Sequence, residues 1–174
     1  MSKLARRPID ISNVEVTFTD YNLKVKGKHG DLNLNIDRSV NLDITDNAIS
    51  VSSKNKAFLG LYCALISNMV KGVTEQFTET LILKGVGYRA TISNNVINFN
   101  LGYSHPSSYT LDDKVKAELI SPTEIKLVGV DKQQVGQAAA QIIQLRPAKK
   151  DPYKEKGIQR ARDRIIKKVG KKVK

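Results

Sequence analysis

The chain has 174 residues, of which 40% are apolar, and it carries a formal net charge of +12 at pH 7. This length suits one medium domain or two small domains with ordinary hydrophobic cores. The single cysteine, Cys63, excludes an internal disulfide and a cysteine-built metal site. No run approaches the roughly 20 apolar residues that span a bilayer, and the start lacks the apolar core of a secretory signal. We therefore expect a soluble intracellular protein that binds nucleic acid or another anionic surface.

The first half of the chain alternates apolar and polar residues with a period of two, which is typical of strands with one buried face. This pattern runs from residue 9 to residue 51, with turn residues between the runs. From residue 53 the spacing becomes helical. The expected helix has an inner face of Phe58, Leu61, Leu65 and Met69, a cap at Ser52 or Ser53, and an end at Gly72.

The second half repeats this order of strands followed by a helix. Strand patterns cover residues 81–92, 96–101, 115–119 and 125–128. A second helix is expected between Asp131 and Pro147, with an inner face of Val135, Ala138, Ala139, Ile142 and Leu145. A shift of 76 residues aligns Val51, Leu59, Gly60, Ala64, Ile66 and Met69 with Leu127, Val135, Gly136, Ala140, Ile142 and Leu145. We predict an α+β fold of two tandem duplicated small domains, each an antiparallel sheet covered by one helix, plus a basic C-terminal tail. The predicted boundaries are 1–80, 81–147 and 148–174.

The charge of the chain is concentrated at its C-terminal end. Residues 146–174 hold 13 of the 29 lysines and arginines against 3 acidic residues, hence a net charge of +10. Their low apolar content predicts that they become ordered only on a polyanion. Gly157 would let the backbone approach a phosphate, and Ile158, Ala161 and Ile165 are at helical spacing. Charge alone leaves RNA, DNA and an acidic membrane open as partners.

The sequence contains no clear pattern of a catalytic or metal site. Gly85-Val86-Gly87 lacks the third glycine and the following helix of a nucleotide-binding loop, so it is better interpreted as hairpin architecture. His29 and His105 have no cysteine or acid at metal-ligand spacing. His29 is interpreted as a turn residue, whereas His105 is either a loop residue or a phosphate contact. We predict no enzymatic activity and no cofactor.

Several motifs occur in one order: NMVKGVTE at 68–75, GVGYRA at 85–90, LGYSHP at 101–106 and DPYKEKGI at 151–158, with VKG at 25–27 as a fifth match. Together they resemble the large-subunit ribosomal protein L6 family in its bacterial form, over nearly the whole chain. The resemblance implies a structural constituent of the large ribosomal subunit that binds large-subunit ribosomal RNA near the stalk base and translation-factor site, through the second domain and tail. It also implies neighbouring large-subunit ribosomal proteins as partners and no membrane. Because no transit-type start is visible, we expect a cytoplasmic ribosome, with an organellar ribosome as the alternative. The alternative is a general nucleic-acid or anionic-surface binding module.

The chain also departs from the family pattern in its tail. Ala148-Lys149-Lys150 resembles a small insertion with two extra cations, Glu155 stands where the family commonly has glycine, and Gln159-Arg160 replaces a basic residue and an aromatic. The resemblance makes Tyr88 structural. The predicted RNA-binding residues are Arg89, His105, Lys149, Lys150, Tyr153, Lys154, Lys156, Gly157, Arg160, Arg164, Lys167, Lys168, Lys171 and Lys172.

Overall fold

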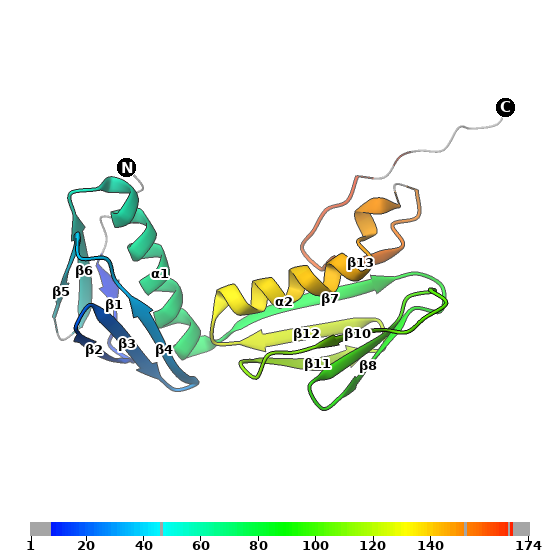
Figure 1. Cartoon of the computed structure of the whole chain (residues 1–174), viewed down its shortest axis with the longest axis horizontal. Coiled ribbons are helices and arrows are strands. Elements are labelled where there is room, and N and C mark those ends of the chain that lie inside the picture. Colours follow the sequence, from blue (N-terminus) through cyan, green and yellow to red (C-terminus); the bar gives the residue numbers. More distant parts are fainter. Residues whose placement is uncertain (1–7, 46, 152, 167, 169–174) are drawn as a thin grey trace. The chain divides into compact units, whose positions relative to one another are not determined.

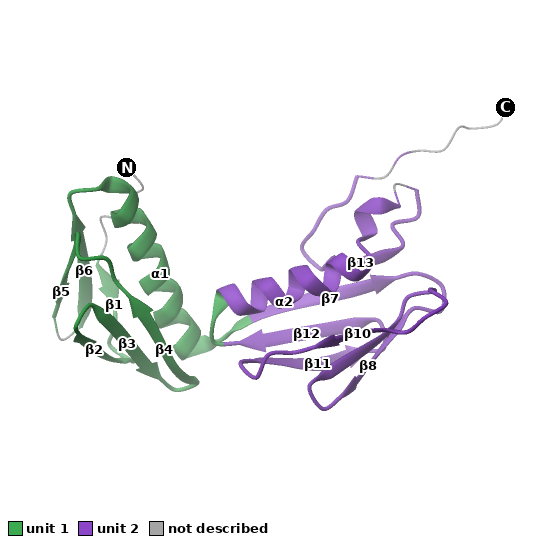
Figure 2. Cartoon of the chain, viewed as in Figure 1, with its two compact units in different colours: residues 1–77, 130–132 green, residues 78–129, 133–174 purple. Residues whose placement is uncertain are grey.

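The chain forms two compact units (Figure 2). The computed structural model describes residues 8–45, 47–151, 153–166 and 168. Unit 1 contains residues 1–77 and 130–132, and unit 2 contains residues 78–129 and 133–174. Each unit combines antiparallel strand pairs with one long helix (Figure 1), which confirms the predicted α+β fold class.

Unit 1 contains two three-stranded sheets, with strand orders β2-β3-β4 and β1-β6-β5. The strands are β1 (Ile9–Asp10), β2 (Glu15–Thr19), β3 (Asn22–Gly27), β4 (Gly30–Asn35), β5 (Val40–Ile44) and β6 (Ala48–Ser53). The β2–β3 hairpin turns at Asp20 and Tyr21, whose φ angles of 47° and 59° suit a two-residue hairpin loop. Alternate residues of a strand face the same side, so Leu23 and Val25 are both fully buried in the core.

Helix α1 (Lys56–Glu75) packs against strands from both sheets of unit 1. Its buried residues are Cys63, Ile66, Met69, Gly72 and Val73. The predicted inner face is therefore rotated, because Leu61 is 49% exposed whereas Cys63 is buried. By length and composition α1 would be able to cross a membrane, but Ile66 and Val73 lie fully buried in the core of unit 1. It is thus the central packing helix of this unit.

The N-terminus of α1 differs from the prediction. Asn55, rather than Ser52 or Ser53, is the capping residue, and its side chain accepts a hydrogen bond from the Ala57 amide at 3.0 Å. The Ser53 hydroxyl instead accepts a hydrogen bond from the Asn55 amide at 3.2 Å. Serine and asparagine are both good capping residues, so the sequence pattern alone did not distinguish them.

The C-terminus of α1 also differs, since the helix continues past Gly72 to Glu75. Gly72 is buried, and a Cβ atom built there would lie 2.0 Å from the carbonyl oxygen of Val130. The glycine therefore permits close approach of a backbone segment rather than ending the helix. That segment is distant in the chain, which is why local spacing suggested a helix end instead.

Unit 2 contains one three-stranded and one four-stranded sheet, with strand orders β8-β9-β10 and β11-β12-β7-β13. The strands are β7 (Phe77–Lys84), β8 (Arg89–Ser93), β9 (Val96–Asn100), β10 (Ser107–Thr110), β11 (Val115–Ser121), β12 (Glu124–Gly129) and β13 (Gly157–Arg160). Helix α2 (Lys132–Leu145) buries Val135, Ala138, Ala139 and Ile142, which confirms most of its predicted inner face. A short 3-10 helix, η2 (Ala148–Lys150), follows α2.

The two units share a repeated arrangement of strands and helix. Strands β6 and β12 begin at Ala48 and Glu124, and helices α1 and α2 begin at Lys56 and Lys132. Both separations equal the predicted repeat of 76 residues. The sheet β1-β6-β5 of unit 1 corresponds to the run β7-β12-β11 of unit 2. Unit 2 differs by one added strand, β13.

Strand β13 comes from the predicted tail. It pairs antiparallel with the second half of β7, and Ile158 within it is fully buried. The Ile158 amide also donates a hydrogen bond to the carbonyl of Arg146 at 2.7 Å. The expectation that the tail is ordered only by a partner is therefore wrong for residues 157–160, as is their helical interpretation. The open edge of β7 supplies the backbone partners that the tail itself lacks.

Candidate nucleic-acid interface

One end of unit 2 brings together three sequence motifs that lie far apart in the chain. Arg146, just after α2, stacks its guanidinium over Tyr88 of GVGYRA at 5.3 Å and over Tyr103 of LGYSHP at 4.6 Å from the ring centroids. The same guanidinium donates a hydrogen bond to the carbonyl of Leu101. Gly157 of DPYKEKGI pairs with Lys84 at the end of β7. These contacts join the motifs into one surface.

The GVGYRA motif forms a tight turn between β7 and β8. Tyr88 is buried, and a Cβ atom at Gly85 would lie 2.6 Å from its ring, so only glycine leaves room for the tyrosine. Gly87 has a φ of +74°, a conformation that glycine adopts readily. Both glycines thus have an architectural role, and Tyr88 has the packing role that the family resemblance implied. Arg89, the next residue, is exposed.

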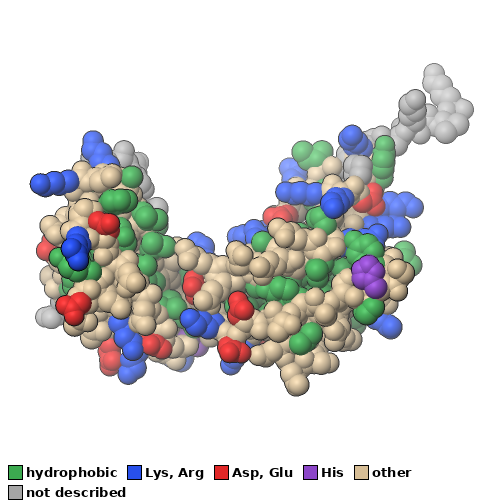
Figure 3. Space-filling model, in the orientation of Figure 1, with side chains coloured by type: hydrophobic (Ala, Val, Ile, Leu, Met, Phe, Trp, Pro, Cys, Tyr) green, Lys and Arg blue, Asp and Glu red, His purple; other side chains and the backbone are tan. Residues whose placement is uncertain are grey.

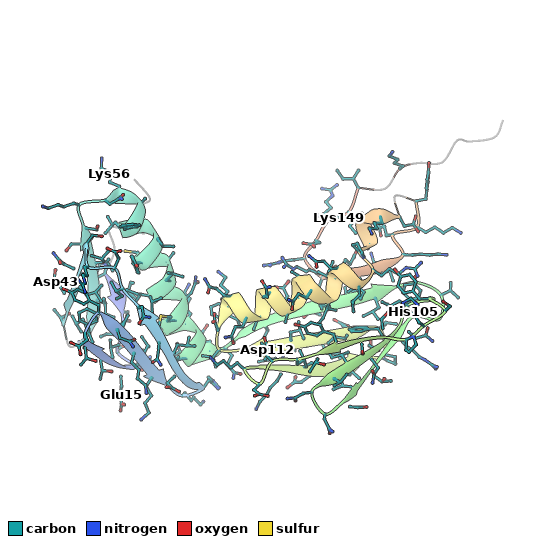
Figure 4. All side chains as sticks on the ribbon, viewed as in Figure 1. Glu15, Asp43, Lys56, His105, Asp112 and Lys149 are labelled. Atoms are coloured by element: carbon teal, nitrogen blue, oxygen red, sulfur yellow. The ribbon has the colours of Figure 1, made fainter. Side chains whose placement is uncertain are left out.

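An open hollow lies beside the LGYSHP motif on unit 2. Its volume is about 450 Å³, and it is lined by Arg89, Thr91, Asn98, Phe99, Asn100, Tyr103, Ser104, His105 and Pro106. The rings of Tyr103 and His105 are stacked, with centroids 5.6 Å apart and planes inclined by 7°. His105 is exposed at this edge of the unit (Figure 4). The hollow therefore combines an exposed aromatic ring with a cationic and several neutral polar side chains.

The loop that contains Tyr153 and Lys154 is organised by Asp151. The carboxylate of Asp151 accepts hydrogen bonds from the amides of Tyr153 and Lys154, both at 3.1 Å, and from the amide of Lys156 at 3.4 Å. The hydrogen bonds donated by the backbone amides of Lys154 and Tyr153 lower the pKa of the Asp151 carboxyl, because they stabilise its ionised form. The result is a fixed loop that leaves the side chains of Tyr153 and Lys154 exposed.

Glu155 is the acidic residue at the position where the resemblance led us to expect glycine. Its φ is +53°, which explains the preference for glycine at this position. The side chain is 6% exposed and pairs with the ammonium group of Lys84 at 3.1 Å. Glu155 is thus held in a left-handed conformation and links the loop to the end of β7.

Gly157 has a different role from the predicted phosphate approach. It is buried, its φ is +149°, and a Cβ atom there would lie 2.6 Å from both the Ala148 amide nitrogen and the Arg146 carbonyl oxygen. The close approach is therefore to the backbone of the same chain. The prediction of Gly157 as an RNA contact is corrected accordingly, since its surroundings are already filled.

Glu79 on β7 holds two of the tail arginines. Its carboxylate lies 3.6 Å from Nε of Arg160 and 3.2 Å from a terminal nitrogen of Arg162. The Arg160 side chain is only 26% exposed, whereas that of Arg162 is 68% exposed. Arg160 thus belongs partly to the packing of β13 against β7, and its charge is partly offset by Glu79.

The remaining predicted contacts divide by exposure. Lys149, Lys150, Arg164 and Lys168 are exposed, and Lys156 is half-buried. Together with Lys154 and Arg162 they give the C-terminal part of unit 2 a cluster of cationic side chains (Figure 3), beside the exposed ring of Tyr153. Lys167, Lys171 and Lys172 lie outside the described residues.

Sequence reasoning missed the importance of Arg146 and Tyr103. From the sequence, Arg146 was counted only as one of the positive charges of the tail. In the structure its guanidinium connects two aromatic rings of separate loops. The hydroxyl of Tyr103 further donates a hydrogen bond to the carbonyl of Leu145 at 3.3 Å. The useful signal would have been an arginine between a helix end and Pro147, in a chain with few aromatic residues.

No cluster of metal-ligating side chains occurs within residues 8–45, 47–151, 153–166 and 168. Cys63 is buried in α1, and burial raises the pKa of its thiol, which disfavours the reactive thiolate.

The duplicated fold and the cationic end of unit 2 define a basic α+β protein of the class that binds polyanions.

Comparison with known proteins identifies the family. The chain belongs to the ribosomal protein L6 family, whose sequence model matches residues 12–76 and 84–161. It is 42% identical to the large ribosomal subunit protein uL6 of Geotalea daltonii, with 98% of each chain covered. The proteins of the same name from Psychrobacter arcticus and Shewanella woodyi are 43% and 45% identical, with 99% of each chain covered.

These comparisons confirm the resemblance drawn from the five motifs. The chain is a ribosomal protein of the large subunit, of bacterial type and therefore cytoplasmic. Members of this family are structural components of the ribosome, so the prediction of no enzymatic activity is confirmed as well. The two matched segments correspond to the two repeated halves of the chain.

Proposed function

We propose that the chain binds large-subunit ribosomal RNA through unit 2 and its cationic tail, near the stalk base and the translation-factor site. The observation that carries this proposal is the set of exposed side chains around Asp151, namely Lys149 and Lys150 on η2 and Tyr153 and Lys154, whose amides Asp151 binds. Cations release counterions from RNA phosphates, and an exposed tyrosine offers a stacking surface. A fixed loop loses less conformational freedom on binding than a flexible one.

The acidic residues around this loop support the same proposal. Glu79, Asp151 and Glu155 are each engaged within the unit, by arginines, by backbone amides and by Lys84 respectively. Their charges therefore help to hold the loop and strand in place. The outward-facing lysines remain as phosphate contacts, and we propose them as the principal ones.

A salt titration tests this proposal. We would measure the affinity of the full chain for deproteinised large-subunit ribosomal RNA across salt concentrations, for the wild type and for Lys149→Ala/Lys150→Ala/Lys154→Ala. Each lost phosphate contact should reduce the slope of log K against log[salt] by about 0.7 to 0.9, so the triple variant should lose about 2 to 3 in slope.

The matched control replaces three exposed lysines of unit 1: Lys28→Ala/Lys54→Ala/Lys71→Ala. It removes the same formal charge, so a merely general attraction would give the same loss of slope. An unchanged slope for the loop variant, or equal losses for both variants, would contradict the proposed interface.

The second candidate is a general nucleic-acid or anionic-surface binder, which the high charge by itself favours. It predicts that duplex DNA or anionic vesicles compete with ribosomal RNA at equal charge concentration. The proposed location is tested separately by cross-linking from Tyr153 within assembled large subunits. Cross-links to the stalk base or its neighbouring proteins are expected, and cross-links only elsewhere would contradict the location.

A further inference from the structure

The aromatic cluster of unit 2 extends from its core to its surface. Tyr88 is buried, Arg146 stacks on both Tyr88 and Tyr103, and Tyr103 stacks on His105. The planes of Tyr103 and His105 differ by only 7°. His105 lies at the exposed end of this series, and its ring stacks on Tyr103, which is held by Arg146 and by a hydrogen bond to the Leu145 carbonyl.

The side chains beside His105 come from the outer face of the β8-β9-β10 sheet. Arg89 on β8 is paired in register with Asn100 on β9, and Thr91 is paired with Asn98. Ile97 and Phe99, which alternate along β9 with the two asparagines, are buried, so Asn98 and Asn100 face outward. The hollow at this place thus has a floor of polar side chains and an aromatic ring at one edge.

This combination matches the chemistry of an unpaired nucleobase. A base stacks on a supported aromatic ring, and its polar edge pairs with amide groups, which both donate and accept hydrogen bonds. Arginine adds a cation for a base edge or the adjoining phosphate. The hollow of about 450 Å³ is within the range of small-ligand sites, roughly 300 to 1,000 Å³. None of the described residues that line it is acidic.

We infer that this hollow receives one unstacked nucleobase of the bound RNA, which stacks on His105 and pairs with Asn98 or Asn100. The inference rests on the proposed RNA-binding function and gives it a second, base-reading contact, separate from the phosphate contacts of the tail. A phosphate contact at His105 would require only a ring N–H. The parallel support of the ring by Tyr103 instead favours a partner that uses the ring face.

Substitutions at His105 distinguish a stacked base from a phosphate contact. His105→Trp keeps an aromatic face and should bind large-subunit ribosomal RNA about as tightly as the wild type. His105→Lys keeps a cation without a ring and should bind about 5- to 150-fold more weakly, the range that loss of one base–aromatic stack gives. The same loss is expected for His105→Ala. His29→Lys, on the exposed histidine of unit 1, is the matched control and should be neutral.

The Trp variant also reports directly, because the chain contains no tryptophan of its own. Stacking of a base on the indole should quench the fluorescence of His105→Trp when the RNA is added. His29→Trp should remain unquenched under the same conditions. Thermal unfolding of each variant checks that unit 2 is intact.

The outcomes separate this inference from the function on which it rests. If His105→Lys binds normally and His105→Trp binds weakly, or if the indole is not quenched on binding, the base site is wrong while RNA binding stands. If the wild-type chain shows no preference for ribosomal RNA over duplex DNA, the proposed function itself fails. Retained affinity with Trp, loss with Lys and quenching confined to position 105 would support the inference.

Discussion

At the scale of single residues, the acidic side chains of unit 2 determine where its basic side chains lie. Asp151 fixes three backbone amides of the loop, Glu155 pairs with Lys84, and Glu79 pairs with Arg160 and Arg162. Exposed ion pairs contribute little to stability, but Glu155 and Glu79 are mostly buried and connect separate segments. These ion pairs therefore serve mainly to hold separate segments of unit 2 together, and only secondarily to neutralise its positive charge.

Gly157 is the residue whose replacement should disturb this arrangement most. In Gly157→Ala the new Cβ would meet the backbone of Arg146 and Ala148 at 2.6 Å, in a φ region that alanine disfavours. We expect unit 2 to lose about 2 kcal/mol or more of stability, because both strain and displaced backbone oppose the fold. Chemical denaturation, followed by amide exchange in β7 and β13, measures the loss.

Gly136→Ala is the matched control for this prediction. Gly136 lies in α2, and a Cβ atom there has no neighbour within 4 Å. Alanine is the better helix former by about 1 kcal/mol, so this substitution should be neutral or stabilising. A Gly157→Ala variant as stable as the wild type would contradict the packing role assigned to the glycine.

At the scale of elements, both helices start at the same point of the repeat but differ in how they are used. Helix α1 has 20 residues and reaches both sheets of unit 1, whereas α2 has 14 residues. Tyr109 also donates a hydrogen bond to the side chain of Gln141 on α2 at 2.7 Å. The polar residues of α2 therefore take part in contacts within unit 2 as well as facing outward.

The cap of α1 gives a prediction at this scale. In Asn55→Ala the amide of Ala57 loses its side-chain acceptor, and we expect a cost of about 1 kcal/mol to unit 1. Ser52→Ala is the control, because its exposed hydroxyl makes only a long hydrogen bond of 3.5 Å to Asn41. Urea titrations measure the free energy of unfolding of both variants. A larger loss of stability for Ser52→Ala than for Asn55→Ala would contradict the assigned cap.

At the scale of the whole molecule, charge and fold are distributed unequally along the chain. Residues 1–145 carry about +2 and the last 29 residues +10, yet residues 157–160 of that basic segment are built into a sheet. The edge of β7 accepts β13, and this places ordered cations beside the loops of GVGYRA and LGYSHP. Unit 2 thus presents both the proposed phosphate-binding surface and the polar hollow.

Truncation separates these two parts of the basic segment. A chain ending at residue 166 keeps β13, so unit 2 should unfold at the wild-type midpoint while the salt slope for RNA falls with its five lost lysines. A chain ending at residue 145 loses β13 and exposes β7, so unit 2 should also be destabilised. Thermal unfolding combined with amide exchange in β7 measures the stability of unit 2 in both truncated chains. A salt titration with ribosomal RNA measures the slope. Equal stability of the two chains would contradict the structural role of β13.

The sequence by itself determined the fold class, the repeat of 76 residues, the family and the uneven charge. These follow from local periodicity, internal similarity and composition, each of which is readable without knowing what lies across the fold. Hence most of the strands and most of the inner face of α2 were predicted from the residues around them, whereas β10 and β13 lie outside the predicted strand patterns. The structural role of Tyr88 was predicted from the family resemblance.

Only the tertiary structure decided which positions are occupied by partners from distant segments. Gly72 and Gly157 are approached by backbones 58 and 9 or more residues away, and β13 is a strand because the edge of β7 is open to it. Arg146 became important because two loops place tyrosines on its guanidinium. Such contacts depend on spatial neighbours that leave no local pattern, which is why β13 could not be recognised from the charge of the tail.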